Sequence, residues 1–161
     1  MKLKMAAFGI MVAAFALFAQ KAPAVAFTLN GLDGKQVSLT DYAGKVVVID
    51  FWATWCQACK EAFPKLNDLL HEFGPQGVEV MGINIEHMKP ERISAFVSNA
   101  EIDYKVLLDP KAETVKTFGI KGVPSLVVIA ADGTVQQIFR GINKQTEKEV
   151  RGLLITLTQK K

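Results

Sequence analysis

The sequence VVVIDFWATWCQAC, residues 46–59, sets the architecture of this chain. Val46–Trp52 is apolar at every position except Asp50, and a strand that is apolar on both faces is typical of a sheet centre covered by helices. The next three residues form a turn, and a helix is predicted to begin at or just before Cys56. It should end at Gly74-Pro75, because glycine and proline terminate helices. The chain is therefore expected to run from a buried strand directly into a helix.

Strands and helices alternate along the rest of the chain. Two short strands flank a turn at Asp33-Gly34 and predict a hairpin, and Ala131-Asp132-Gly133 joins two later strands in the same way. The last helix should start at Thr146, because Glu149 completes a capping box with it. Further elements are expected at strand 78–85, helix 90–98, strand 104–108, helix 112–118, and strands 125–130 and 134–139. This pattern predicts an α/β fold with an N-terminal hairpin and a mixed central sheet flanked by helices.

The first 26 residues have the composition of an export signal. Two lysines precede an unbroken apolar run at 5–19, and small residues similar to a signal-peptidase site follow at 22–26. A helix over the apolar run would span about 22 Å, which is less than the ~30 Å hydrocarbon core of a bilayer. A cleaved signal peptide is therefore favoured over a retained N-terminal membrane anchor, and both remain open. We expect residues 1–26 to direct export, to the periplasm or the outer face of the cytoplasmic membrane, and residues 27–161 to form the folded domain.

The net charge of +3 comes entirely from the same N-terminal segment. Residues 1–26 carry three lysines and no acidic residue, and the remainder has 16 basic and 16 acidic residues. A protein that binds nucleic acid is expected to carry a basic face on its folded part. The composition therefore argues against a nucleic-acid partner.

Cys56 and Cys59 are the only cysteines, and their C-x-x-C spacing fits four kinds of site. A structural disulfide across so short a loop gains little chain entropy. A zinc site ordinarily needs four ligands, and the two histidines, His71 and His87, have no paired spacing. Haem attachment needs a histidine after the second cysteine, where the sequence has Lys60. A redox pair remains, with no metal and no cofactor other than the disulfide itself.

The predicted position of Cys56 suits nucleophilic chemistry. Unpaired N–H groups and the dipole at a helix N-terminus stabilise an anion, and the thiolate is the form of cysteine that attacks a disulfide. Cys59 lies one turn further into the helix, within reach of Cys56. We therefore expect Cys56 to attack a substrate disulfide and Cys59 to resolve the mixed disulfide that results.

Two segments resemble the thioredoxin family, and especially its exported TlpA/ResA-type branch. Val48–Cys56 is similar to the active-site approach of that family, and Gly122–Ser125 is similar to its loop in which a cis-proline faces the cysteines. Residues 90–108 match the helix and strand inserted in the TlpA/ResA branch. The likeness runs from Phe27 to near Gln159. It implies a thioredoxin-like fold with a central helix–strand insertion, and a thiol–disulfide oxidoreductase activity.

The resemblance assigns roles to further residues. It makes Pro124 the cis-proline, and it implies that Val123 offers backbone hydrogen bonds to an extended substrate segment. Trp55 would flank the active site on the exposed side, while Trp52 would pack beneath it. The family commonly has proline before the second cysteine, and Ala58 stands at that position here, which leaves the redox potential open.

Asp50 and Glu86 are the candidate acids. Burial raises the pKa of a carboxyl, and Asp50 matches the buried acid of thioredoxins, so it is expected to accept the proton of Cys59. A purely structural aspartate is the alternative. Thioredoxins often carry a lysine close to this acid, but the corresponding residue here is Gly82, which should raise the pKa of Asp50 further. Glu86 is a candidate second acid near the end of the next strand, although a solvated loop is the favoured interpretation there.

The resemblance implies a reductant of disulfides in exported proteins, with apocytochrome c maturation as the commonest assignment. Protein thiols and disulfides would be its substrates, and a membrane-linked donor would supply electrons. The uncharged Gln57-Ala58 dipeptide also favours a reductant, because strong oxidants of this fold usually stabilise their reduced form with a histidine or other donor there. An oxidase or isomerase of secreted disulfides remains an alternative, as does a copper or haem chaperone that uses the same cysteines.

Overall fold

The strand that carries Asp50 lies inside the sheet and is buried along its whole length. The computed structural model describes residues 26–159. In it, β3 (Val46–Trp52) is buried at all seven positions. It pairs in parallel with β4 (Val78–Asn84) and antiparallel with β6 (Ser125–Ile129). The sheet is therefore mixed, as the sequence pattern predicts.

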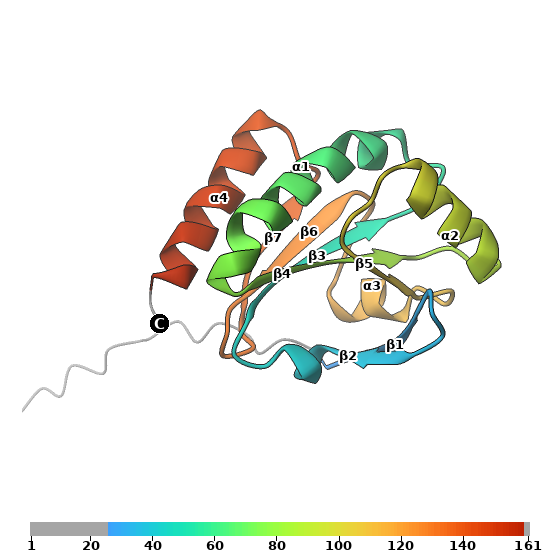
Figure 1. Ribbon diagram of the computed structural model, residues 1–161, viewed down its shortest axis with the longest axis horizontal. Coiled ribbons are helices and arrows are strands. Elements are labelled where there is room, and N and C mark those ends of the chain that lie inside the picture. The colour runs from blue at the N-terminus through green and yellow to red at the C-terminus, as the bar shows by residue number, and fades with distance from the viewer. Residues whose placement is uncertain (1–25, 160–161) are drawn as a thin grey trace, which may run out of the picture.

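The described part of the chain contains seven strands, four α-helices and two short 3-10 helices. Besides β3, β4 and β6, the strands and α-helices are β1 (Thr28–Gly31), β2 (Gln36–Ser38), β5 (Lys105–Leu108), β7 (Val135–Arg140), α1 (Gln57–Phe73), α2 (Pro90–Asn99), α3 (Glu113–Thr117) and α4 (Lys144–Thr158). The strands form one sheet in the order β2-β1-β5-β4-β3-β6-β7 (Figure 1). The β1–β2 hairpin joins one side through β5, and β7 closes the other side. Apart from α4 and the N-terminal hairpin, the elements predicted by residue range are present with ends shifted by one residue at most.

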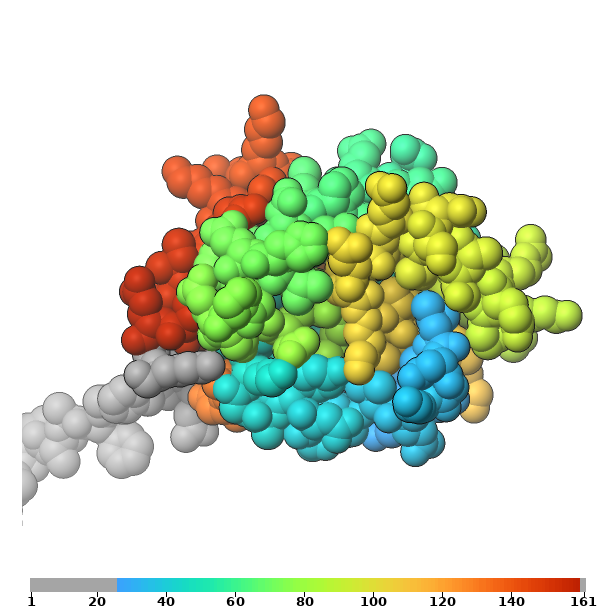
Figure 2. Space-filling view, in the orientation of Figure 1, coloured from blue at the N-terminus to red at the C-terminus, as the bar shows by residue number. Residues whose placement is uncertain are grey.

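The two faces of the sheet pack against different helices. Successive side chains of a strand point to opposite faces. Val48 and Trp52 join a core with residues of α1, α2 and α4, whereas Ile49 and Phe51 join a core with the region of α3 and the β1–β2 hairpin. Figures 1 and 2 show α1 and α4 side by side over the first face. Asp50 lies two residues from both Val48 and Trp52, so its side chain lies on the same face as theirs, which α1 covers.

The start of the last helix differs from the prediction. α4 begins at Lys144, and its N-cap is Asn143 rather than Thr146. Asn143 Oδ1 accepts hydrogen bonds from the backbone N–H groups of Gln145 and Thr146, both at 2.9 Å. Glu149 accepts a hydrogen bond from the side-chain amide of Gln145 at 2.7 Å instead of completing a capping box. Asparagine is the stronger N-cap residue, and the helix therefore starts three positions earlier.

The predicted export segment falls almost entirely outside the described residues. Of residues 1–26, only Ala26 is described. Among the helices between residues 26 and 159, none combines the length and the apolar character needed to cross a bilayer.

Candidate active site

Cys56 and Cys59 form a disulfide at the start of α1. Their Cα atoms are 5.3 Å apart. Cys56 is the N-cap of the helix, and its Sγ accepts a hydrogen bond from the backbone N–H of Cys59 at 3.1 Å. Cys56 keeps 5% of its surface exposed, whereas Cys59 is fully buried. Cys56 is therefore the member of the pair that an incoming sulfur atom can reach.

A carboxylate from the loop after β4 holds the turn before Cys56. Glu86 Oε2 accepts hydrogen bonds from the backbone N–H of Thr54 at 2.6 Å and from Asn84 Nδ2 at 3.1 Å. Its Oε1 accepts a hydrogen bond from the Thr54 hydroxyl at 3.0 Å. Glu86 does lie in a loop, but its side chain is partly buried and bonded rather than solvated. It anchors the turn that presents Cys56, and its function as a second acid stays a prediction.

The sequence contains a signal for this anchor in the order of its strands. β3 and β4 are parallel neighbours, and the carboxyl ends of parallel neighbours meet at one edge of a sheet. Thr54 follows β3 by two residues, and Glu86 follows β4 by two residues. A carboxylate and a turn at equivalent positions after adjacent strands are placed to bond each other.

Asp50 is fully buried on the face that also contains Cys59 and Tyr104. The Tyr104 hydroxyl donates a hydrogen bond to Asp50 Oδ2 at 3.2 Å, and Oδ1 has no hydrogen-bond partner within residues 26–159. Burial raises the pKa of Asp50 from 3.8 to about 7, and the hydrogen bond from Tyr104 opposes that rise. Gly82 of β4 lies directly opposite Asp50. The predicted burial of Asp50 is thus confirmed, and Asp50 has a phenolic neighbour in place of a cation.

Tyr104 is the residue of this site that the sequence analysis missed. It lies just before β5, which pairs with β4 rather than with the strand of Asp50. A lone tyrosine at a strand end carries little sequence signal. The available signal is Gly82, because glycine inside a strand often marks the close approach of another group. A Cβ atom added at Gly82 would lie 3.0 Å from Cε2 of Tyr104.

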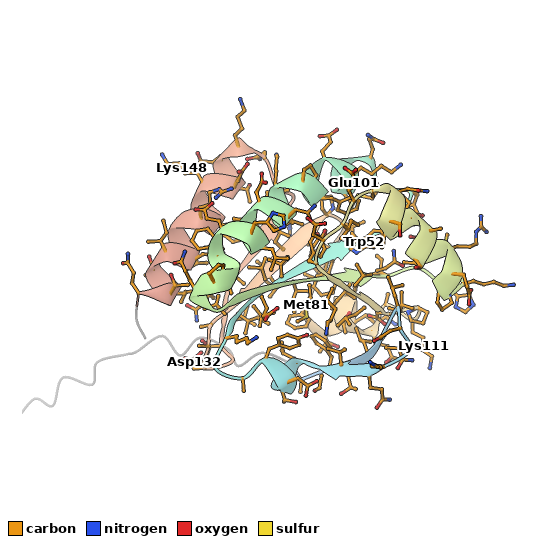
Figure 3. The ribbon with its side chains drawn as sticks, viewed as in Figure 1. Trp52, Met81, Glu101, Lys111, Asp132 and Lys148 are labelled. Carbon is orange, nitrogen blue, oxygen red and sulfur yellow. A yellow bond between two sulfur atoms is a disulfide. The ribbon has the colours of Figure 1, made fainter. Side chains whose placement is uncertain are left out.

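The loop before β6 forms the other side of the site. The Val123–Pro124 peptide bond is cis, as the resemblance implies. Val123, Pro124 and Ala58, which stands between the cysteines, line one groove of about 510 Å³. Trp55 is 69% exposed beside the disulfide, whereas Trp52 is fully buried beneath the helices (Figure 3). Both tryptophans therefore lie as predicted.

Known proteins resemble the chain over most of its length. Residues 19–138 match the AhpC/TSA family. The chain is 30% identical over 132 residues to the thiol-disulfide oxidoreductase ResA of Bacillus thuringiensis subsp. konkukian (strain 97-27), across 82% of this chain and 75% of that relative.

Solved structures share the fold. A putative thiol:disulfide interchange protein DsbE from Chlorobium tepidum has a TM-score of 0.80 and 28% identity, covering 86% of this chain and 96% of that one. The exposed lipoprotein thioredoxin of Streptococcus pneumoniae strain TIGR4 has a TM-score of 0.71 and 26% identity, covering 83% and 100%. With the Cys56–Cys59 disulfide in place, these matches show that the chain belongs to the AhpC/TSA family and is a thioredoxin-like thiol–disulfide oxidoreductase of the ResA type.

Proposed function

We propose that this chain is an exported reductant of protein disulfides that works through Cys56 and Cys59. The observation that carries the proposal is a disulfide at the N-terminus of α1 in which only Cys56 keeps exposed surface. In the reduced chain, the Cys56 thiolate attacks a substrate disulfide, a mixed disulfide forms, and one substrate thiolate leaves. The Cys59 thiolate then attacks the Cys56 sulfur and releases the second substrate thiolate. Two electrons pass to the substrate, the chain is left oxidised, and a separate donor must restore the dithiol.

Cys59 must lose its proton before it attacks, and Asp50 is the acceptor in this proposal. Both residues are fully buried on the face of the sheet that α1 covers. Because burial raises the pKa of Asp50 to about 7, both protonation states of its carboxyl are populated near neutral pH. A general base works best when its pKa lies near the working pH.

The surroundings of Cys56 favour a reductant over a strong oxidant. Strong oxidants of this kind have a very stable reduced form. Here the Gln57-Ala58 dipeptide is uncharged, and Cys56 Sγ accepts a hydrogen bond from the Cys59 backbone alone within the described chain. Lys60 Nζ lies 5.9 Å from the centroid of the Phe96 ring, on the α2 side. The helix N-terminus therefore supplies most of the stabilisation of the thiolate, which leaves the dithiol able to give up its electrons.

The substrate binds, in this proposal, along the groove beside Val123 and Pro124. Neither the backbone N–H nor the backbone C=O of Val123 forms a hydrogen bond within residues 26–159. Both groups are available to an extended segment, which would bind by main-chain hydrogen bonds as an added strand does. The exposed indole of Trp55 flanks the disulfide and adds apolar contact area. The substrate class that fits is an extended polypeptide with a disulfide.

In this proposal, the chain works outside the cytoplasm. The apolar run at 5–19 behind two lysines supports export, and so does the similarity to an exposed lipoprotein thioredoxin. A membrane-linked donor returns electrons to the disulfide. The resemblance to ResA-type proteins supports apocytochrome c as a substrate.

Trapping of the mixed disulfide tests the proposal. A Cys59→Ser variant that carries the N-terminal segment should accumulate in disulfide-linked complexes with exported proteins. Cys56 still attacks the substrate disulfide, but no second cysteine is present to resolve the mixed disulfide. Mass spectrometry would then identify those proteins. Cys56→Ser is the matched control and should capture none of them. The proposal fails if Cys59→Ser captures no exported protein, or if both variants capture the same set.

A further inference from the structure

We infer that Tyr104 is a positioning residue for the proton transfer from Cys59: its hydroxyl holds Oδ2 of Asp50 and leaves Oδ1 as the oxygen that receives the proton. This inference rests on the proposed role of Asp50 as the proton acceptor. It assigns the transferred proton to one oxygen of Asp50, and it adds Tyr104, which lies outside residues 46–59.

The contacts of the two carboxylate oxygens differ. Tyr104 is buried, and its hydroxyl is 3.2 Å from Asp50 Oδ2. Asp50 Oδ1 is equally inaccessible to solvent but has no hydrogen-bond partner in the part of the chain that the structure describes. A buried oxygen without a donor is energetically costly unless a proton reaches it. Oδ1 is therefore the acceptor that the site leaves open, on the face shared with Cys59.

Gly82 makes room for this arrangement. It lies opposite Asp50 in the β3–β4 ladder, and a Cβ atom there would be 2.7 Å from Trp52 Nε1 and 3.0 Å from Tyr104 Cε2. The Trp52 indole cannot easily give way, because rings pack on it from two helices. It stacks on Phe96 of α2, with ring centroids 5.4 Å apart, and meets Phe63 of α1 edge-on. A side chain at Gly82 would therefore displace the Tyr104 ring from Asp50.

Among residues 26–159, no charged side chain opposes or replaces the hydrogen bond from Tyr104. The strands on either side present Gly82 and Leu126 opposite Asp50. Of the buried residues of α1, Cys59 is the one with an ionisable side chain. Burial, the larger effect, raises the pKa of Asp50, and the hydrogen bond from Tyr104 acts to lower it. Burial also raises the pKa of Tyr104 well above its usual value. The hydroxyl therefore stays protonated and remains a donor throughout the working pH range.

Loss of the hydroxyl should shift the resolving step to higher pH. A hydrogen bond to the ionised carboxylate favours ionisation, so its removal raises the pKa of Asp50, by about one unit for a bond to a charged group. At pH 7 the ionised fraction of Asp50 would fall roughly fivefold for such a rise from a pKa of about 7. The attack by Cys56 precedes this proton transfer and should not change.

A two-phase assay separates the two steps. One equivalent of a symmetrical aromatic disulfide, whose thiolate product absorbs visible light, is mixed with the reduced protein. The first product thiolate reports attack by Cys56, and the second reports resolution by Cys59. In Tyr104→Phe the first phase should match the wild type, and the pH midpoint of the second phase should rise by about one unit. Tyr42→Phe makes the same chemical change at the chain's other tyrosine and should leave both phases unchanged.

The outcomes distinguish the role of Tyr104 from the proposed role of Asp50 as proton acceptor. If Asp50→Asn abolishes the pH dependence of the second phase but Tyr104→Phe leaves its midpoint unmoved, Tyr104 does not position the proton and the role of Asp50 stands. A uniform slowing at every pH in Tyr104→Phe also overturns the inference, because a purely structural defect would act that way. If Asp50→Asn keeps the wild-type profile, the role of Asp50 itself is wrong.

A measurement on the unmutated oxidised protein removes any dependence on how the variants fold. The ring carbon signals of Tyr104 should follow the ionisation of Asp50, with a midpoint near pH 7, because the hydroxyl is bonded to the carboxyl that titrates. The signals of Tyr42 should show no such transition. Tyr104 signals that stay constant across this range would contradict the inference.

Discussion

Replacing Asp50 with asparagine should remove a pH dependence from the stability of the oxidised protein. Asp50 is fully buried, and burial raises its pKa from 3.8 to about 7 in the folded chain. The folded state thus binds this proton more tightly than the unfolded state does. The corresponding stability is fully present below about pH 4 and is lost as the pH rises through 7. Because each pKa unit corresponds to about 1.4 kcal/mol, the total loss is on the order of 4 kcal/mol.

Urea unfolding at pH 5 and at pH 8 measures the accessible part of this loss. Relative to Asp50→Asn, the wild type should lose about 3 kcal/mol between the two pH values, since part of the effect already occurs below pH 5. Both proteins must be oxidised, so that the cysteines do not titrate. Asp68→Asn, at an exposed carboxylate of α1, is the matched control and should follow the wild type. An equal loss in wild type and Asp50→Asn would refute the reasoning, because Asp50 would then not ionise at a raised pKa.

Three further outcomes are expected. In the reduced protein, brief treatment with iodoacetamide should label Cys56 well before Cys59, which is fully buried; equal labelling in a peptide map would contradict their assigned roles. Glu86→Ala should lower the free energy of unfolding by about 2 kcal/mol, because the backbone N–H and the hydroxyl of Thr54 both lose their carboxylate acceptor. A urea titration that shows no change would exclude Glu86 as the anchor of this turn. Gly82→Ala should destabilise by about 1–3 kcal/mol through overpacking, whereas Gly152→Ala, in α4 with open space around it, should stabilise by up to about 1 kcal/mol. Equal thermal shifts for the two alanine variants would contradict the crowding at Gly82.

The segment from β3 to α1 was predictable because its signals are local. A run of apolar residues broken only by Asp50 indicates a central strand, and the cysteine spacing that follows it restricts the chemistry to a few kinds of site. The burial of Asp50 follows from the same run, since a residue inside a covered strand has no route to solvent. The cis bond before Pro124 was predictable only through resemblance to a family, because sequence spacing gives no information about peptide isomers.

The parts that sequence reasoning missed depend on contacts between distant elements. Tyr104 lies 54 residues from Asp50, and their contact depends on the register of two strands that are not adjacent. In the sequence, Gly82 stands where a lysine is common, which indicates only that Asp50 lacks a cationic neighbour. In the structure, its small size leaves space for the ring of Tyr104. The error at α4 has a different cause: Asn143 and Thr146 both suit an N-cap, and the sequence pattern gave weight to Glu149 rather than to the stronger cap.

The redox potential of the Cys56–Cys59 couple tests most directly the claim that this chain is a reductant. The protein would be equilibrated with glutathione buffers of increasing oxidised fraction, and the dithiol and disulfide forms would be quantified after acid quenching and alkylation. Because Gln57-Ala58 adds no charge to the stabilisation that the helix N-terminus gives Cys56, we expect a potential clearly more negative than about −180 mV, the value of protein disulfide isomerase. A potential less negative than about −180 mV would contradict the account and would make the chain an oxidant of exported thiols.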